Sequence, residues 1–188
     1  MFNKIKLKFT VISIATVIVA LLSQGTLAYY STAYKSTNVV TSGDIQFIIH
    51  EKNERGENFP ADGVYIVPGD AVSKEVSFEN ICNHPFYLRV KLVPDVDSKE
   101  LSADDLFKLY TDENNWILKD GWYYYKGVVE PEKTTPTLLS KVEIIGENVD
   151  NNHLGKNLTL SVVAQAVQSE NNPVNGTDTY TASGWPKE

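Results

Sequence analysis

The strongest constraint on the fold of this chain is a series of short runs in which apolar and polar residues alternate. In residues 86–92 every second position is apolar, and tyrosine, arginine and lysine lie between them. A period of two is typical of a β-strand with one buried face. Comparable β-type runs cover residues 45–49, 64–67, 74–79, 122–126, 138–145 and 158–167. Because turn-rich segments and no long helices separate these runs, the sequence predicts an all-β fold, an antiparallel β-sandwich of the jelly-roll or Ig-like type.

One stretch between the predicted strands has a helical signal instead. Ser102 and Asp105 have the Ser-x-x-Asp spacing of a capping box, and Asp104 adds a second acidic residue where a helix N-terminus favours negative charge. Leu106 to Tyr110 could continue the helix for one or two turns. We therefore expect a short inserted helix over residues 102–110.

Residues 1–28 differ in composition from the rest of the chain. Three lysines at positions 4, 6 and 8, with no acidic residue, precede an apolar run from Phe9 to Leu22. This run is shorter than the roughly 20 apolar residues that span a bilayer. The pattern is typical of a secretory signal peptide, with cleavage expected between Ala28 and Tyr29. A retained membrane anchor is the alternative interpretation.

Removal of this leader takes 28 of the 188 residues and three lysines, so 160 residues remain and the formal charge moves from −7 to −10. That length suits one domain, and we divide the chain into a signal peptide (1–28), an N-terminal arm (29–41), a β-sandwich (42–170) and a C-terminal tail (171–188). An acidic chain is a poor partner for nucleic acid. We expect a secreted protein that meets the membrane only during export.

Candidate catalytic residues are few. The three histidines, His50, His84 and His153, lack the zincin spacing of two histidines four residues apart with a glutamate between them, and we expect them on the surface. Cys82 is the single cysteine, which excludes an intrachain disulfide, and it lies two residues from His84. With no orienting carboxylate evident, a half-buried free thiol is the favoured interpretation over a nucleophile. We predict no catalytic residue, no metal ligand and no cofactor.

An acidic group precedes and overlaps the predicted helix. It lacks the spacing and the central glycine of a dedicated calcium loop, so a solvated surface with helix capping is the simpler interpretation. Its members are Asp95, Asp97, Glu100, Asp104 and Asp105.

Consecutive aromatic residues occupy one predicted strand. Trp122, Tyr123, Tyr124 and Tyr125 would alternate between its two faces. One pair can fill the core, while the other can face outward as an interaction surface for protein or sugar. Core packing with an ordinary surface remains the alternative.

Several segments, taken in order, resemble the TasA/camelysin-like family. The junction at residues 25–31, Gly-Thr-Leu-Ala-Tyr-Tyr-Ser, is similar to sites cut by the SipW-type signal peptidase. Later segments that resemble the family are Gly43-Asp44-Ile45, Pro68-Gly69-Asp70 before a lysine-containing strand that ends at Asn80, Tyr87-Leu88-Arg89-Val90, the stretch from Asp120 to Lys126, Pro131-Glu132-Lys133-Thr134-Thr135, Leu138-Leu139 and Ala164-Gln165-Ala166-Val167-Gln168. The family usually has Pro-Gly-Glu where this chain has Pro131-Glu132-Lys133.

The resemblance implies a jelly-roll-like sandwich, export from a Gram-positive bacterium through a SipW-type signal peptidase, and assembly with itself or related subunits into biofilm matrix or surface fibres. The camelysin branch is described as metallopeptidase, although no metal-binding motif maps onto this chain. A camelysin-like metallopeptidase therefore stays an alternative, as does a monomeric cell-surface adhesin or carbohydrate-binding module that uses Trp122.

The arm suggests how such fibres could form. It is β-prone and carries few charges. It could add as a strand to the open sheet edge of the next copy, in a head-to-tail contact that propagates, or it could pair within its own domain. The residues expected to carry this contact are Tyr29, Tyr30, Tyr34, Val39 and Val40.

Overall fold

The computed structural model describes residues 30–31, 36–40, 45–60, 64–66, 69–97, 102–103, 105–148 and 157–186. The predicted leader, with its cleavage site at Ala28 and Tyr29, lies outside these ranges, and so does Tyr34. The strands are β1 (Tyr30–Ser31), β2 (Ser36–Val40), β3 (Phe47–Lys52), β4 (Tyr65–Ile66), β5 (Ala71–Asn80), β6 (Phe86–Val96), β7 (Phe107–Thr111), β8 (Trp116–Lys119), β9 (Trp122–Tyr125), β10 (Leu139–Ile144) and β11 (Leu158–Gln168). The 3-10 turns η1 (Gly146–Asn148) and η3 (Thr179–Thr181) are short.

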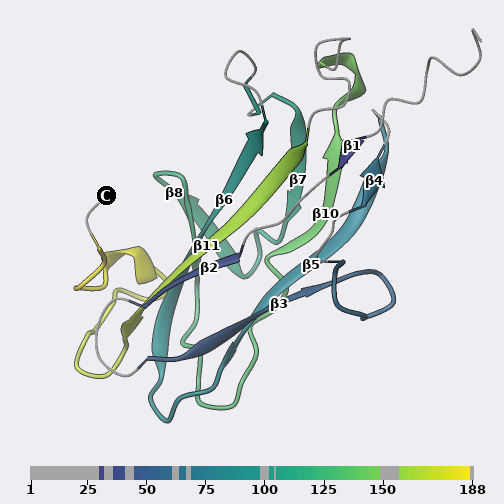
Figure 1. Ribbon diagram of the computed structural model, residues 1–188. Helices are drawn as coiled ribbons and strands as arrows, with labels where there is room; N and C mark the ends of the chain where they lie inside the picture. Colours follow the sequence, from purple (N-terminus) through teal and green to yellow (C-terminus); the bar gives the residue numbers. More distant parts are fainter. Residues whose placement is uncertain are drawn as a thin grey trace, which may run out of the picture.

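Two sheets enclose the core (Figure 1). One has the strand order β3-β5-β10-β7, and the other has the order β2-β11-β6-β9-β8. The longest ladder joins β6 to β11, from Leu158 opposite Val96 to Gln168 opposite Phe86. All pairings between named strands are antiparallel except that of β2 with β11, which is parallel. The predicted all-β sandwich is confirmed.

The alternating pattern forms the core as expected. On β6, Phe86, Leu88 and Val90 are fully buried, and on β5 so are Val76 and Phe78. Aromatic rings pack closely within this core: the ring centroids of Phe47 and Phe86 are 5.9 Å apart, and those of Phe78 and Trp116 are also 5.9 Å apart. Such tilted ring contacts add to the stabilisation that comes from apolar burial.

The helix predicted over residues 102–110 is wrong. In the part of this stretch that the structure describes, Leu106 N–H donates to the Ala103 carbonyl at 3.1 Å in a single turn, and the chain then enters β7. Phe107 is buried while Lys108 is exposed, which is the alternation of a strand. Pairing of β7 with β10 supplies several ladder contacts. These contacts together outweigh a helix cap, which contributes about 1 kcal/mol.

The segment after β11 packs against the outer face of the five-stranded sheet. A small apolar cluster forms there, separate from the main core. Its buried members are Tyr87 of β6, Val167 of β11 and Ala182, and Trp185 packs against them. We call residues 171–186 the C-terminal strap. Thr179 Oγ1 donates to the Tyr125 carbonyl at 2.7 Å, which joins the strap to the end of β9.

Candidate functional site

The N-terminal arm contributes edge strands to its own chain. In β2, Ser36 lies opposite Val162 and Val40 lies opposite Ala166 of β11. In β1, Tyr30 lies opposite Ile66 of β4 (Figure 1). Because β2 is the outermost strand of its sheet, any extended segment with the same backbone geometry could take its place.

The predicted aromatic interaction surface is divided between the two faces of β9. Tyr123 and Tyr125 pack against the main core, and the ring centroid of Tyr125 is 5.3 Å from that of Trp116. Trp122 and Tyr124 face the other way, but they are only 4% and 6% exposed. The expectation that outward rings on this strand are open to a partner is therefore wrong. The reason differs for the two rings. The strap covers Tyr124, whose ring centroid is 5.5 Å from that of Trp185, whereas the Arg89 guanidinium of β6 lies over the Trp122 ring.

A buried arginine fastens the strap to the sheet. The Arg89 guanidinium lies 4.2 Å from the ring centroid of Trp122 and 5.0 Å from that of Trp185. It donates hydrogen bonds to Gln165 Oε1 at 2.6 and 2.8 Å, to the Tyr124 hydroxyl at 3.1 Å and to the Pro186 carbonyl at 2.8 Å. Planar stacking and a fork of fixed donors suit arginine and not lysine. Sequence reasoning missed this arrangement because a basic residue in an alternating strand indicates a solvent-facing position.

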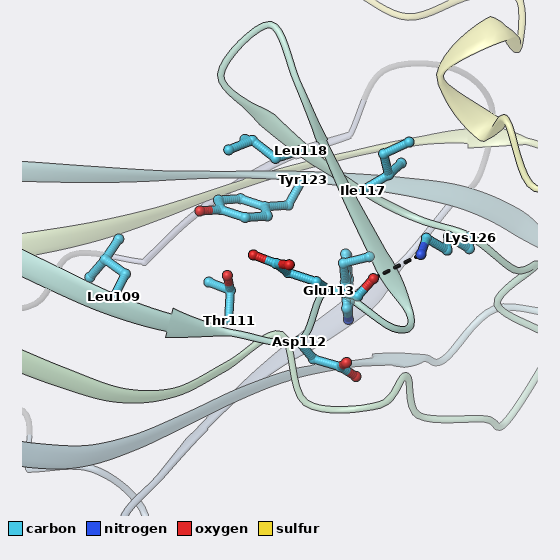
Figure 2. A pocket seen from close by; sticks show the side chains of 9 residues that line it. Leu109, Thr111, Asp112, Glu113, Ile117, Leu118, Tyr123 and Lys126 are labelled. Atoms are coloured by element: carbon cyan, nitrogen blue, oxygen red, sulfur yellow. Dashed lines mark hydrogen bonds between the residues drawn. The ribbon is translucent and has the colours of Figure 1, made fainter.

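A groove lies beside the loop of residues 112–115, which joins the end of β7 to the start of β8. We call it the β7–β8 groove; its cavity has a volume of about 390 Å³. Leu109 of β7, Leu118 of β8 and Tyr123 of β9 supply apolar side chains to it (Figure 2). The remaining lining residues are Thr111, Asp112, Glu113, Trp116, Ile117 and Lys126. Leu118 is 59% exposed although it lies two positions from the buried Trp116, so the core-facing side of β8 is uncovered at this end.

The polar groups of this groove differ in whether they have hydrogen-bond partners. Figure 2 shows the Glu113 carboxylate between Tyr123 and Thr111, and among the described residues it has no hydrogen bond or ion pair. Lys126 Nζ instead donates to the main-chain carbonyl of Glu113 at 2.8 Å, which holds the loop. The Trp116 side chain is buried, and its Nε1 has no hydrogen-bond partner within the described ranges. The groove thus combines an apolar wall with a carboxylate that has no protein partner among the described residues.

Asp112 organises the loop beside the groove. Its carboxylate accepts from Asn115 Nδ2 at 2.7 Å and from the Asn114 N–H at 2.9 Å. The side-chain hydrogen bond from Asn115 is the largest cause of a lowered Asp112 pKa, and backbone N–H groups act in the same direction. Asp112 therefore stays ionised while it shapes the loop, and Glu113 is left to face the groove.

A buried ion pair lies on the other sheet. Lys74 of β5 is fully buried, and its Nζ is 2.8 Å from Glu51 Oε2 of β3. The Phe59 ring centroid is 4.5 Å from the same Nζ. Burial lowers the pKa of Lys74, although the hydrogen bond and charge of Glu51 oppose this change. Glu51 Oε1 is buried with no partner in the described part of the chain, so the pair is not fully satisfied.

Cys82 is a free, half-buried thiol, as the sequence predicted. Its Sγ contacts Asn80 Oδ1 at 3.0 Å and the main-chain carbonyl of His84 at 3.3 Å. The His84 ring instead faces Glu170, with Nδ1 3.8 Å from Oε2. This arrangement does not place an imidazole base on the thiol.

The remaining polar candidates lie apart from one another. His50 Nε2 is 2.7 Å from Glu79 Oε2 on the adjacent strand, and both side chains are partly exposed. Asp95, Asp97 and Asp105 are exposed, whereas His153, Glu100 and Asp104 lie outside the described residues. In the described ranges, no three His, Cys, Asp or Glu side chains gather closely enough to hold a metal ion.

Comparison with known protein families, with curated proteins and with solved structures finds no match. Within the described residues, no helix is long and apolar enough to cross a membrane.

Proposed function

We propose that this protein is an exported structural subunit of an extracellular matrix or of surface fibres, and that its copies join by exchange of the N-terminal arm. The observation that carries the proposal is the position of β2: a terminal segment forms the outermost strand of the five-stranded sheet, on β11. The TasA-like resemblance and the predicted signal peptide support the same function and the same secreted location.

Arm exchange follows from the pairing of β11. One side of β11 pairs with β6 along its whole length, and its other side pairs with β2 over residues 162–166. When β2 leaves, the N–H and C=O groups on that side of β11 lose their partners, which is costly for a strand whose side chains help to form the core. An arm from a second copy would restore the same pairing. When each copy gives its arm to one neighbour and receives an arm from a different neighbour, the contact is head-to-tail and extends into a fibre.

The two alternatives have less support. The described residues bring no set of metal donors together for a camelysin-like metallopeptidase. A carbohydrate-binding module based on Trp122 requires this buried ring, which the Arg89 side chain covers, to become exposed. Neither alternative uses the edge position of the arm.

Deletion of residues 29–40 tests this proposal. The shortened protein should keep the far-ultraviolet circular dichroism of a β-sandwich but form no fibres by electron microscopy. As a matched pair, Asn38→Pro/Val39→Pro should abolish fibres while Asn38→Ala/Val39→Ala retains them, because only proline removes the backbone donors. Fibres that persist unchanged in the deletion variant would rule out arm exchange.

A further inference from the structure

We propose that the β7–β8 groove is a docking site for an extended basic segment of a partner protein. This site is separate from the arm and does not depend on fibre formation. In the strand order of the five-stranded sheet, β8 and β2 are at opposite edges.

Apolar surface that normally faces a sandwich core is open in this groove. Trp116 and Leu118 share one face of β8, yet Trp116 is 2% exposed and Leu118 is 59% exposed. Leu118 lies opposite Tyr123, which packs against the core, and Leu109 of β7 lines the same cavity. A cavity of about 390 Å³ can hold one or two large side chains from a partner.

The walls of the groove favour an extended peptide over a compact ligand. β7 is the last strand of the four-stranded sheet, and β8 is the last strand of the five-stranded sheet. An edge strand presents unpaired N–H and C=O groups that another backbone can pair with, and every second side chain of that added strand would then point toward the groove.

The negative charge of Glu113 determines which kind of peptide the groove would bind. Glu113 directs a carboxylate without a protein partner into the groove, and the Lys126 ammonium is held by the main-chain carbonyls of Glu113 and Asn114. A lysine or arginine of the partner would therefore pair with Glu113 beside the Tyr123 ring. The acidic chain, with a formal charge of −7, also attracts a basic partner over longer distances.

Titration calorimetry on the full chain, with synthetic peptides as probes, tests the proposal. An eight-residue peptide of alternating lysine and valine should bind, and added salt should weaken the binding. A peptide with glutamate in place of every lysine should not bind, and a lysine–valine peptide with two central prolines should bind at least about tenfold more weakly.

Variants of the groove locate the binding. Glu113→Gln should weaken binding of the lysine–valine peptide by about tenfold, because the charge pair is lost. Glu147→Gln, at an exposed glutamate in η1, is the matched control and should leave binding unchanged. Equal binding to Glu113→Gln and the parent protein would overturn the proposal. Self-association of the full chain that is abolished by Leu118→Asp would also overturn it, because the groove would then belong to a second copy.

Discussion

At the scale of single residues, the buried cations Arg89 and Lys74 are stabilised in different ways. Arg89 lies between indole rings and donates to neutral oxygens. Lys74 pairs with one carboxylate, and that carboxylate keeps a buried oxygen without a partner. The two sites should therefore respond differently to substitution.

Replacement of Arg89 by lysine should be far from conservative. Lysine keeps the charge but loses the planar stacking and most of the four hydrogen bonds, so we expect a loss of about 2 kcal/mol in the free energy of unfolding. Urea denaturation measures this loss. Arg55→Lys, at an exposed loop position, is the control and should change stability by less than about 0.5 kcal/mol. Equal free energies of unfolding for Arg89→Lys and Arg55→Lys would show that the contacts of the Arg89 guanidinium with the two indole rings do not stabilise the fold.

Lys74 should make stability depend on alkaline pH. Its pKa in the folded protein is lowered below 10.5, mainly by burial. As pH rises toward 10.5, the folded state releases this proton before the unfolded state does, so the free energy of unfolding increases. Relative to Lys74→Met, the parent protein should therefore gain stability in urea titrations as the pH rises through the lowered pKa of Lys74 toward 10.5. If the stability of the parent protein minus that of Lys74→Met stays constant or decreases as the pH rises, the lowered pKa is contradicted.

At the scale of elements, the sequence predicts the positions of the core strands better than it predicts which segments pair with them or cover them. Residues 86–92 and 158–167 form β6 and β11 as expected, because each buries one continuous apolar face. The capping signal at Ser102 did not produce a helix, because β10 provides a partner for β7 that local sequence does not reveal. The burial of Trp122 and Tyr124 was likewise hidden, because Arg89 and the strap, which cover these two rings, are distant from β9 in the sequence.

The strap should be a separable unit that protects the outer face of the sheet. Trp185→Ala removes one wall of the Arg89 stack, and we expect a loss of about 2 kcal/mol in stability. Acrylamide quenching of the remaining tryptophans should increase as Trp122 becomes exposed, while the β-sheet circular dichroism is retained. Trp185→Phe keeps an aromatic ring and should show a smaller change. Unchanged quenching in Trp185→Ala would mean that the strap does not depend on this residue.

At the scale of the whole molecule, the two edges of the five-stranded sheet have different surroundings. β2 closes one edge with the terminal arm, and β8 leaves the other beside an open groove. Alternation in the sequence predicts most of the long core strands but not β7 or β8, and the division of the strands between sheets comes from pairing between distant segments. The groove could not be predicted for the same reason, because β7 and β8 belong to different sheets.

The central claim is that the arm of one copy pairs with β11 of the next, and cross-linking tests it most directly. Thr37 lies opposite Val163 in the parallel ladder, so Thr37→Cys and Val163→Cys are placed in separate chains that also carry Cys82→Ser. The two chains are mixed, assembled and oxidised, and intact mass is measured. Arm exchange predicts disulfide-linked pairs that contain one chain of each kind. Fibres without such pairs, together with ready closure of the disulfide inside a single chain that carries both cysteines, would contradict it.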